Sequence, residues 1–185
     1  MKHKMSAKFT LVFLLIVALL IVSLASGCAA RSEMMVPASI KIAKKIPGSV
    51  KVNDIVGGRE NNPFLLLTSH LSSSSFTEAL TDALVKADLF NSVVKGGESD
   101  YLLDVTITSY DQPFIGLGYD VKITTQWELA DSRTLKGIWS DKVVTVYKAN
   151  LGDAFLPAER AQKAGEAAVR ANIAEGINRL SKVTF

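Results

Sequence analysis

The sequence predicts an α+β domain of two layers, in which two helices cover one face of a mainly antiparallel sheet. Three consecutive segments between residues 101 and 148 alternate apolar and polar side chains, which is the pattern of half-buried strands. Two other segments, residues 75–89 and 157–181, repeat apolar residues at helical spacing. One helix precedes the three strands and the other follows them, so both can pack against the same sheet.

Two short strands flank the first helix. The earlier one is expected over residues 49–56, where Val50 and Val52 alternate with polar neighbours. A pair of glycines ends it. The later one covers residues 90–95 and also stops at a pair of glycines, which favour turns.

The first helix begins within a run of serines. Ser75 and Glu78 have the spacing of a capping box, in which Ser75 is the N-cap and Glu78 binds back to its amide. The helix is expected to end near Leu89. Its buried stripe consists of Phe76, Leu80, Ala83, Leu84 and Ala87.

The three longer strands are Tyr101–Tyr110, Tyr119–Leu129 and Ile138–Lys148. The middle strand alternates most regularly, because the even positions from Asp120 to Glu128 are all polar. One face of the sheet must therefore meet water or a polar partner.

The closing helix has a clear beginning. Pro157 fits the first helical position, and Glu159 places an acidic side chain in the first turn. The apolar pattern continues to about Ser181. Gly165 and Gly176 would allow the helix to approach the sheet closely.

The N-terminal segment has the composition of an export signal. Three lysines precede an apolar run at residues 11–22, and small residues follow it. The run is shorter than the roughly 20 apolar residues of a membrane-spanning helix. The sequence Leu24-Ala25-Ser26-Gly27-Cys28 then resembles the signal peptide of a bacterial lipoprotein, although such signals usually carry leucine where Ala25 stands.

The resemblance implies cleavage before Cys28, a diacylglyceryl thioether on its sulfur and an acylated new N-terminus. The alternative is an ordinary secretory peptide cut near Ala25 or Ala30. Two or three acyl chains would fix the protein to its membrane, whereas one chain holds only marginally. In lipoproteins an aspartate after the cysteine retains the protein at the inner membrane. Ala29 therefore indicates the periplasmic face of an outer membrane, with the inner membrane as the alternative.

The predicted organisation has three parts: a signal peptide at residues 1–27, a lipidated tether at 28–48 and a single domain at 49–185. An extended tether of this length could hold the domain tens of ångströms from the bilayer, at ~3.3–3.6 Å per residue.

Charge and composition exclude several functions. The chain has 21 basic and 18 acidic side chains, but three of its lysines lie in the signal segment. The remainder is neutral, which argues against nucleic-acid binding. Cys28 is the single cysteine, and His70 is the single histidine after processing. We therefore expect no disulfide, no metal site and no cofactor.

The residues give little support for catalysis. His70 follows Ser69, but serines around a loop histidine more often form a polar connector before a helix cap. Asp104 should share the polar sheet face with Asp120 or Glu128, where ordinary cross-strand pairs are the simpler interpretation. We expect a protein that is not an enzyme.

The tip between the first two long strands is a candidate partner-binding site. It carries three large apolar residues: Phe114, Ile115 and Leu117. They could form an exposed patch for a partner or lipid, or fold over an open end of the core. The loop at residues 150–156 leaves the same two alternatives open, and a hydrophobic staple at the start of the closing helix would explain Phe155.

The order of elements behind a lipid anchor resembles small envelope lipoproteins of Gram-negative bacteria, such as YajG-type lipoproteins and the lipopolysaccharide-assembly lipoprotein. The tether, the lack of catalytic groups and the polar sheet face flanked by an apolar loop favour a non-enzymatic binding or assembly module with a protein partner in the envelope. An auxiliary subunit of a transport or secretion complex is the alternative, and a cell-wall or lipid hydrolase is a third.

Overall fold

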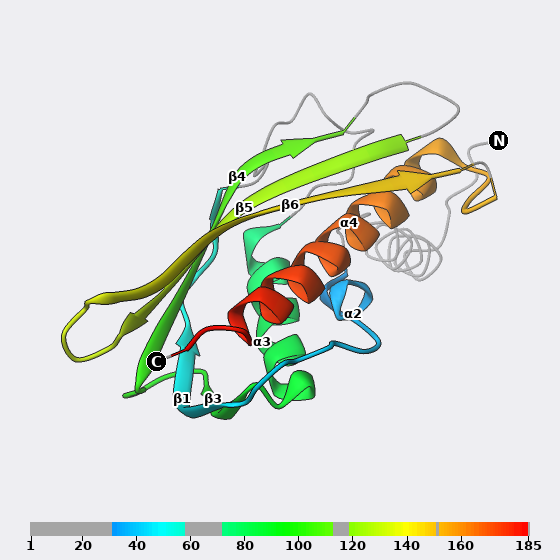
Figure 1. Cartoon of the computed structure of the whole chain (residues 1–185). Helices are drawn as coiled ribbons and strands as arrows, with labels where there is room; N and C mark the ends of the chain where they lie inside the picture. The colour runs from blue at the N-terminus through cyan, green and yellow to red at the C-terminus, as the bar shows by residue number, and fades with distance from the viewer. Residues whose placement is uncertain (1–30, 58–71, 113–118, 151, 185) are drawn as a thin grey trace, which may run out of the picture.

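The computed structural model describes residues 31–57, 72–112, 119–150 and 152–184. They form one open sheet with helices packed on one of its faces (Figure 1). The predicted α+β class, with two layers, is confirmed. Apolar side chains from β-strands and helices meet between the layers, where Trp127, Phe76 and Leu103 are fully buried.

The sheet is mixed and has six strands, in the order β3-β1-β4-β5-β6, with β2 also beside β4. The long strands β4, β5 and β6 are antiparallel, whereas β1 runs parallel to both β3 and β4. The bounds are β1 Ile46–Val52, β2 Val56–Gly57, β3 Phe90–Val94, β4 Tyr101–Asp111, β5 Tyr119–Asp131 and β6 Gly137–Ala149.

Helix α3, Ser73–Ala87, begins earlier than predicted. Its N-cap is Ser72, whose hydroxyl accepts a hydrogen bond from the backbone amide of Ser75 at 3.4 Å. The predicted N-cap at Ser75 is therefore wrong. Ser73 already belongs to the first turn and donates to the carbonyl of Gly57 at 2.6 Å. Consecutive serines offer several equivalent caps, and this tertiary contact selects among them.

Strand β4 changes its buried face along its length. Leu103, Val105 and Ile107 face the helices as predicted. A β-bulge between Ile107 and Ser109 then shifts the alternation, so that Tyr110 is the next core residue.

Helix α4, Pro157–Leu180, begins with its proline in the first turn, as predicted. It lies along β5 and β6 (Figure 1). The expected close approach to the sheet is observed at Gly176, where an added Cβ would overlap the indole ring of Trp127. The backbone of α4 therefore lies directly on the Trp127 ring, with no helix side chain between them.

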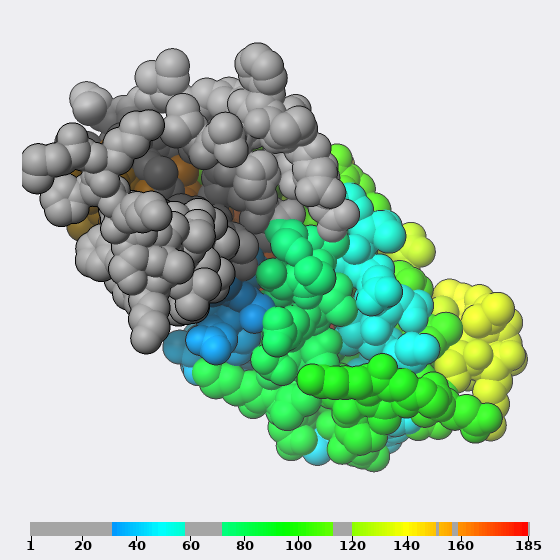
Figure 2. Space-filling view, turned by 180° about the vertical axis from the view of Figure 1, so that it is seen from behind, coloured from blue at the N-terminus to red at the C-terminus, as the bar shows by residue number. Residues whose placement is uncertain are grey.

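The described part of the predicted tether is packed on the domain. The short helix α2, Ser32–Met35, places Met35 in the core, and Figure 2 shows α2 lying against α3. Farther along, the amide of Ala43 donates to the Ser181 hydroxyl at 2.9 Å. This differs from the predicted spacer. The segment has no regular apolar period, so the sequence gives no signal for its docking.

Candidate functional site

The residues predicted as sites all lie outside the described part of the chain. They are Cys28, Phe114, Ile115 and Leu117. Lipidation of Cys28 and partner binding by the other three therefore stay predictions.

The ends of the loop that carries Phe114 are nevertheless defined. Gln112 donates from Nε2 to the carbonyl of Ala161 at 3.0 Å, and Tyr119 pairs with Ala149 across the sheet. The loop thus leaves and rejoins the sheet beside the start of α4.

The first described residue lies on the same half of α4. The backbone amide of Arg31 donates to Glu166 Oε1 at 3.1 Å, and Gln162 Nε2 donates to the same oxygen at 3.0 Å. Glu166 is only 1% exposed. Arg31 is three residues beyond Cys28, so an extended chain places the two Cα atoms at most about 11 Å apart. The domain therefore begins directly after the predicted anchor.

The loop before α4 is braced by two basic side chains. Arg160 is 3% exposed, and its guanidinium donates to the carbonyls of Ala154 at 3.1 Å and Phe155 at 3.2 Å. Lys163 donates to the carbonyl of Asp153 at 2.9 Å. Asp153 in turn accepts from the amide of Asn150 at 2.6 Å, so the whole turn is held in place.

The braced loop presents two apolar side chains to solvent. Phe155 is 93% exposed and Leu156 is 59% exposed. The hydrophobic staple that would have explained Phe155 is therefore not formed. The staple requires an apolar residue at the fourth helical position, and Arg160 occupies it and binds the backbone of the loop instead. That arginine is the sequence signal that could have revealed the exposed phenylalanine.

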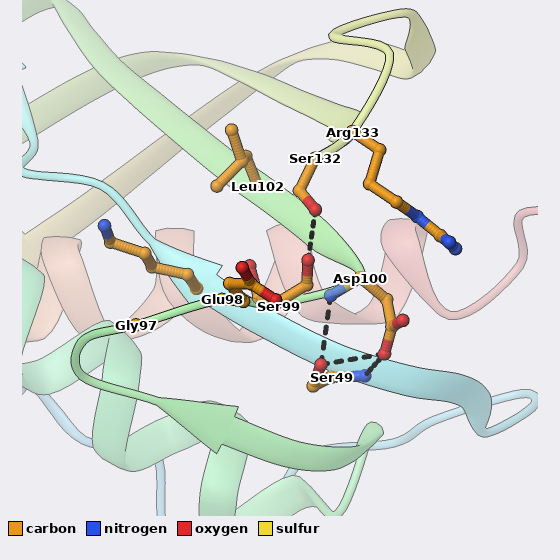
Figure 3. Close-up of a pocket in the computed structure, with 9 residues that line it drawn as sticks. Ser49, Gly97, Glu98, Ser99, Asp100, Leu102, Ser132 and Arg133 are labelled. Carbon is orange, nitrogen blue, oxygen red and sulfur yellow. Dashed lines mark hydrogen bonds between the residues drawn. The ribbon is translucent and has the colours of Figure 1, made fainter.

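A polar hollow of about 560 Å³ lies on the helix-free face of the sheet (Figure 3). It is at the end of the molecule that holds the turn between β5 and β6, far from the loop before α4. It forms where residues 95–100 cross β1 on their way from β3 to β4. Its lining consists of Ser49, Lys51, Gly97, Glu98, Ser99, Asp100, Leu102, Ser132 and Arg133.

Asp100 fastens the crossing segment to β1. Its carboxylate accepts from the Ser49 amide at 2.7 Å and the Ser49 hydroxyl at 2.8 Å (Figure 3). These hydrogen bonds, together with the positive charge of Arg133, lower the pKa of Asp100. The lowered pKa makes the Asp100 carboxylate a weak base, so it is poorly suited to activate the Ser49 hydroxyl as a nucleophile.

The predicted acidic neighbours have ordinary surface partners. Asp104 lies opposite Glu128 in the register of β4 and β5, and its carboxylate accepts a hydrogen bond from Asn53 Nδ2 at 2.8 Å. Asp120 forms an ion pair with Lys148, in which Oδ2 lies 3.6 Å from Nζ. His70 lies outside the described residues. Within the described ranges, no group of three or more acidic, histidine or cysteine side chains could hold a metal ion.

A buried polar network joins β5 to α4, and the sequence analysis missed it. Thr125 donates to Asn172 Oδ1 at 2.7 Å and accepts from the indole Nε1 of Trp127 at 2.8 Å. Asn172 also donates to the carbonyl of Val143 at 3.3 Å. Each buried polar group gains a partner, so the network fixes the position of the helix.

None of the helices in the described ranges has the length and apolar character needed to cross a bilayer.

No family model and no curated protein matches the chain. Among solved structures, the fold resembles that of a Xanthomonas campestris protein of the family DUF330. The TM-score is 0.59 at 11% identity, over 78% of this chain and 91% of that one. A hypothetical protein from Chlamydia trachomatis gives 0.56 at 9% identity, over 75% of this chain and 98% of that one. These two likenesses show a shared fold.

A minor lipoprotein from Acinetobacter baumannii gives a TM-score of 0.45 at 8% identity, over 72% of this chain and 91% of that one.

Proposed function

We propose that the chain is a lipid-anchored envelope lipoprotein that acts as a non-enzymatic binding or assembly module. The observation that carries the proposal is the position of Cys28. It is the single cysteine of the chain, it directly follows an apolar run and small residues, and the packed domain begins three residues later. The residue after it, Ala29, supports retention at the periplasmic face of an outer membrane.

The non-enzymatic part of the proposal is supported by the polar hollow. The Ser49 hydroxyl there donates a hydrogen bond to the Asp100 carboxylate, and the Ser132 hydroxyl donates one to the carbonyl of Ser99. These groups hold the crossing segment against the sheet. A binding module needs a stable surface rather than a poised nucleophile, and this arrangement supplies one.

Metabolic labelling with a palmitate analogue tests the anchor. The wild-type chain, produced in a Gram-negative host, should incorporate the label and should fractionate with outer membranes. Cys28→Ser should lose the label and remain as an unprocessed precursor. Equal labelling of both chains, or a mature wild-type chain that stays in the soluble periplasm, would refute the lipoprotein assignment.

Photo-crosslinking in cells tests the binding role. A photoreactive residue at position 114 should give one dominant protein adduct that disappears in the Cys28→Ser background. The same residue at position 135, in the exposed turn at the far end of β5 and β6, serves as the control. If the adduct is a component of a transport or secretion complex, the auxiliary-subunit alternative replaces the general binding role. Absence of any specific protein adduct would contradict both.

A further inference from the structure

We propose that Phe155 and Leu156 form a membrane-contact patch that inserts into the interface of the bilayer that holds the anchor. The inference rests on the proposed lipidation of Cys28. It assigns a second point of membrane attachment and therefore a fixed orientation of the domain.

The first argument is that the exposure of the patch is built into the fold. Phe155 is 93% exposed, yet the backbone that carries it is held by Arg160, which is itself 3% exposed. A free loop would turn an aromatic side chain toward the core, because burial of apolar area is favourable. The brace prevents this collapse, so the two apolar side chains stay directed outward.

The second argument is the distance to the anchor. Glu166, which binds the amide of Arg31, lies nine residues after Pro157, or about 14 Å along the helix axis. Cys28 lies at most about 11 Å from Arg31. The patch is therefore within reach of the bilayer to which Cys28 would be attached. The turn at residues 132–136 lies at the opposite end of the antiparallel pair β5 and β6.

The third argument is the chemistry of the patch, which favours lipid over a second copy of the chain. A stable protein interface covers about 800 Å² on each partner, whereas one aromatic side chain buries at most ~250 Å². Two side chains fall well below that need. They do suit the boundary between headgroups and acyl chains, where phenylalanine and leucine add to an existing anchor.

The two basic side chains that brace the patch, Arg160 and Lys163, are both engaged. Lys163 is paired with Glu159 at 2.9 Å and with the carbonyl of Asp153. The contact should therefore depend on apolar insertion rather than on anionic headgroups, and it should persist at high salt.

The test uses the single native cysteine to advantage. In the lipidated full-length protein the Cys28 sulfur is blocked, so Phe155→Cys provides one reactive thiol for a polarity-sensitive dye. Leu135→Cys is the matched control, because Leu135 is also an exposed apolar loop residue, at 70% exposure. Both labelled proteins are reconstituted in vesicles of phosphatidylethanolamine and phosphatidylglycerol that contain nitroxide-labelled lipid.

The dye at position 155 should be quenched at least severalfold more by the nitroxide lipid than the dye at position 135, at low and high salt. Equal, weak quenching at both positions would overturn the membrane contact. Self-quenching between dyes at position 155 that persists in excess lipid would assign the patch to a second copy and would also overturn it. Failure of the underlying function is distinguishable by the intact mass of the wild-type protein, which would lack the acyl chains whether cleavage had occurred near Ala25 or near Ala30.

Discussion

Gly176 of α4 lies directly on the indole ring of Trp127 in β5, with no room for a side chain between them. Trp127 is fully buried, so its ring cannot move into solvent to make space. This contact sets the distance between the helix layer and the sheet at the centre of the core.

Gly176→Ala should therefore destabilise the protein. Alanine favours a helix over glycine by about 1 kcal/mol, but overpacking of a core typically costs about 1–3 kcal/mol. Because the new methyl group would meet a rigid ring rather than a flexible chain end, we expect a net loss. Urea unfolding measures it. Gly96→Ala is the control, because an added Cβ there meets nothing within 4 Å. Equal stability of the two variants would show that the layers can separate freely.

The buried hydroxyl of Thr125 gives a second prediction. Thr125→Val should lower the free energy of unfolding by about 1–3 kcal/mol, because the indole N–H of Trp127 and Oδ1 of Asn172 each lose the hydroxyl they bind. Thr124→Val is the control, since Thr124 is also buried but lies outside this network. Both substitutions replace a threonine hydroxyl with a methyl group, so the side chains change shape equally little. A similar effect of both substitutions on urea unfolding would show that the network adds nothing to stability.

Periodicity predicted the strands and helices well because their buried faces are long. The middle strand, the closing helix and the contact at Gly176 all follow from the spacing of apolar residues. Tertiary contacts decide what periodicity does not. The start of α3 depends on the bond from Ser73 to Gly57, and the shift in β4 depends on a bulge.

The candidate site was harder to predict, because it depends on single interactions. Residues 31–45 dock through bonds such as the one from Arg31 to Glu166, and an irregular segment carries no pattern for them. The exposure of Phe155 depends on the direction of one arginine. Thr125 was overlooked because a threonine on a core face is an exception to the alternation.

The carboxylate of Asp100 makes stability depend on pH. Its pKa in the folded protein lies below the ordinary aspartate value of 3.8, chiefly because Ser49 donates two hydrogen bonds to it. Its contribution is therefore fully present above pH 3.8 and is lost as the pH falls through the folded-state pKa. Asp100→Asn should lower Tm at neutral pH, and the difference from wild type should shrink in acid.

Thermal unfolding followed by circular dichroism between neutral and acidic pH measures this difference. Asp82→Asn is the matched control, because Asp82 is exposed on α3. A gap between Asp100→Asn and wild type that stays constant as the pH falls would contradict the proposed fastening role.

Arg160 should control how the loop before α4 is held. Arg160→Gln removes a buried guanidinium that binds two carbonyls, and leaving buried acceptors unpaired costs about 1–3 kcal/mol. The loss should be concentrated in residues 152–156, because the rest of α4 is held by its own core contacts. Chymotrypsin cleaves after phenylalanine, so native-state proteolysis at Phe155 reports the opening of this loop directly.

We expect severalfold faster cleavage in Arg160→Gln than in Arg133→Gln, which changes an exposed arginine at the other end of the molecule. Equal cleavage rates would mean that the loop is held without Arg160, and the fixed outward direction of Phe155 would then need another cause.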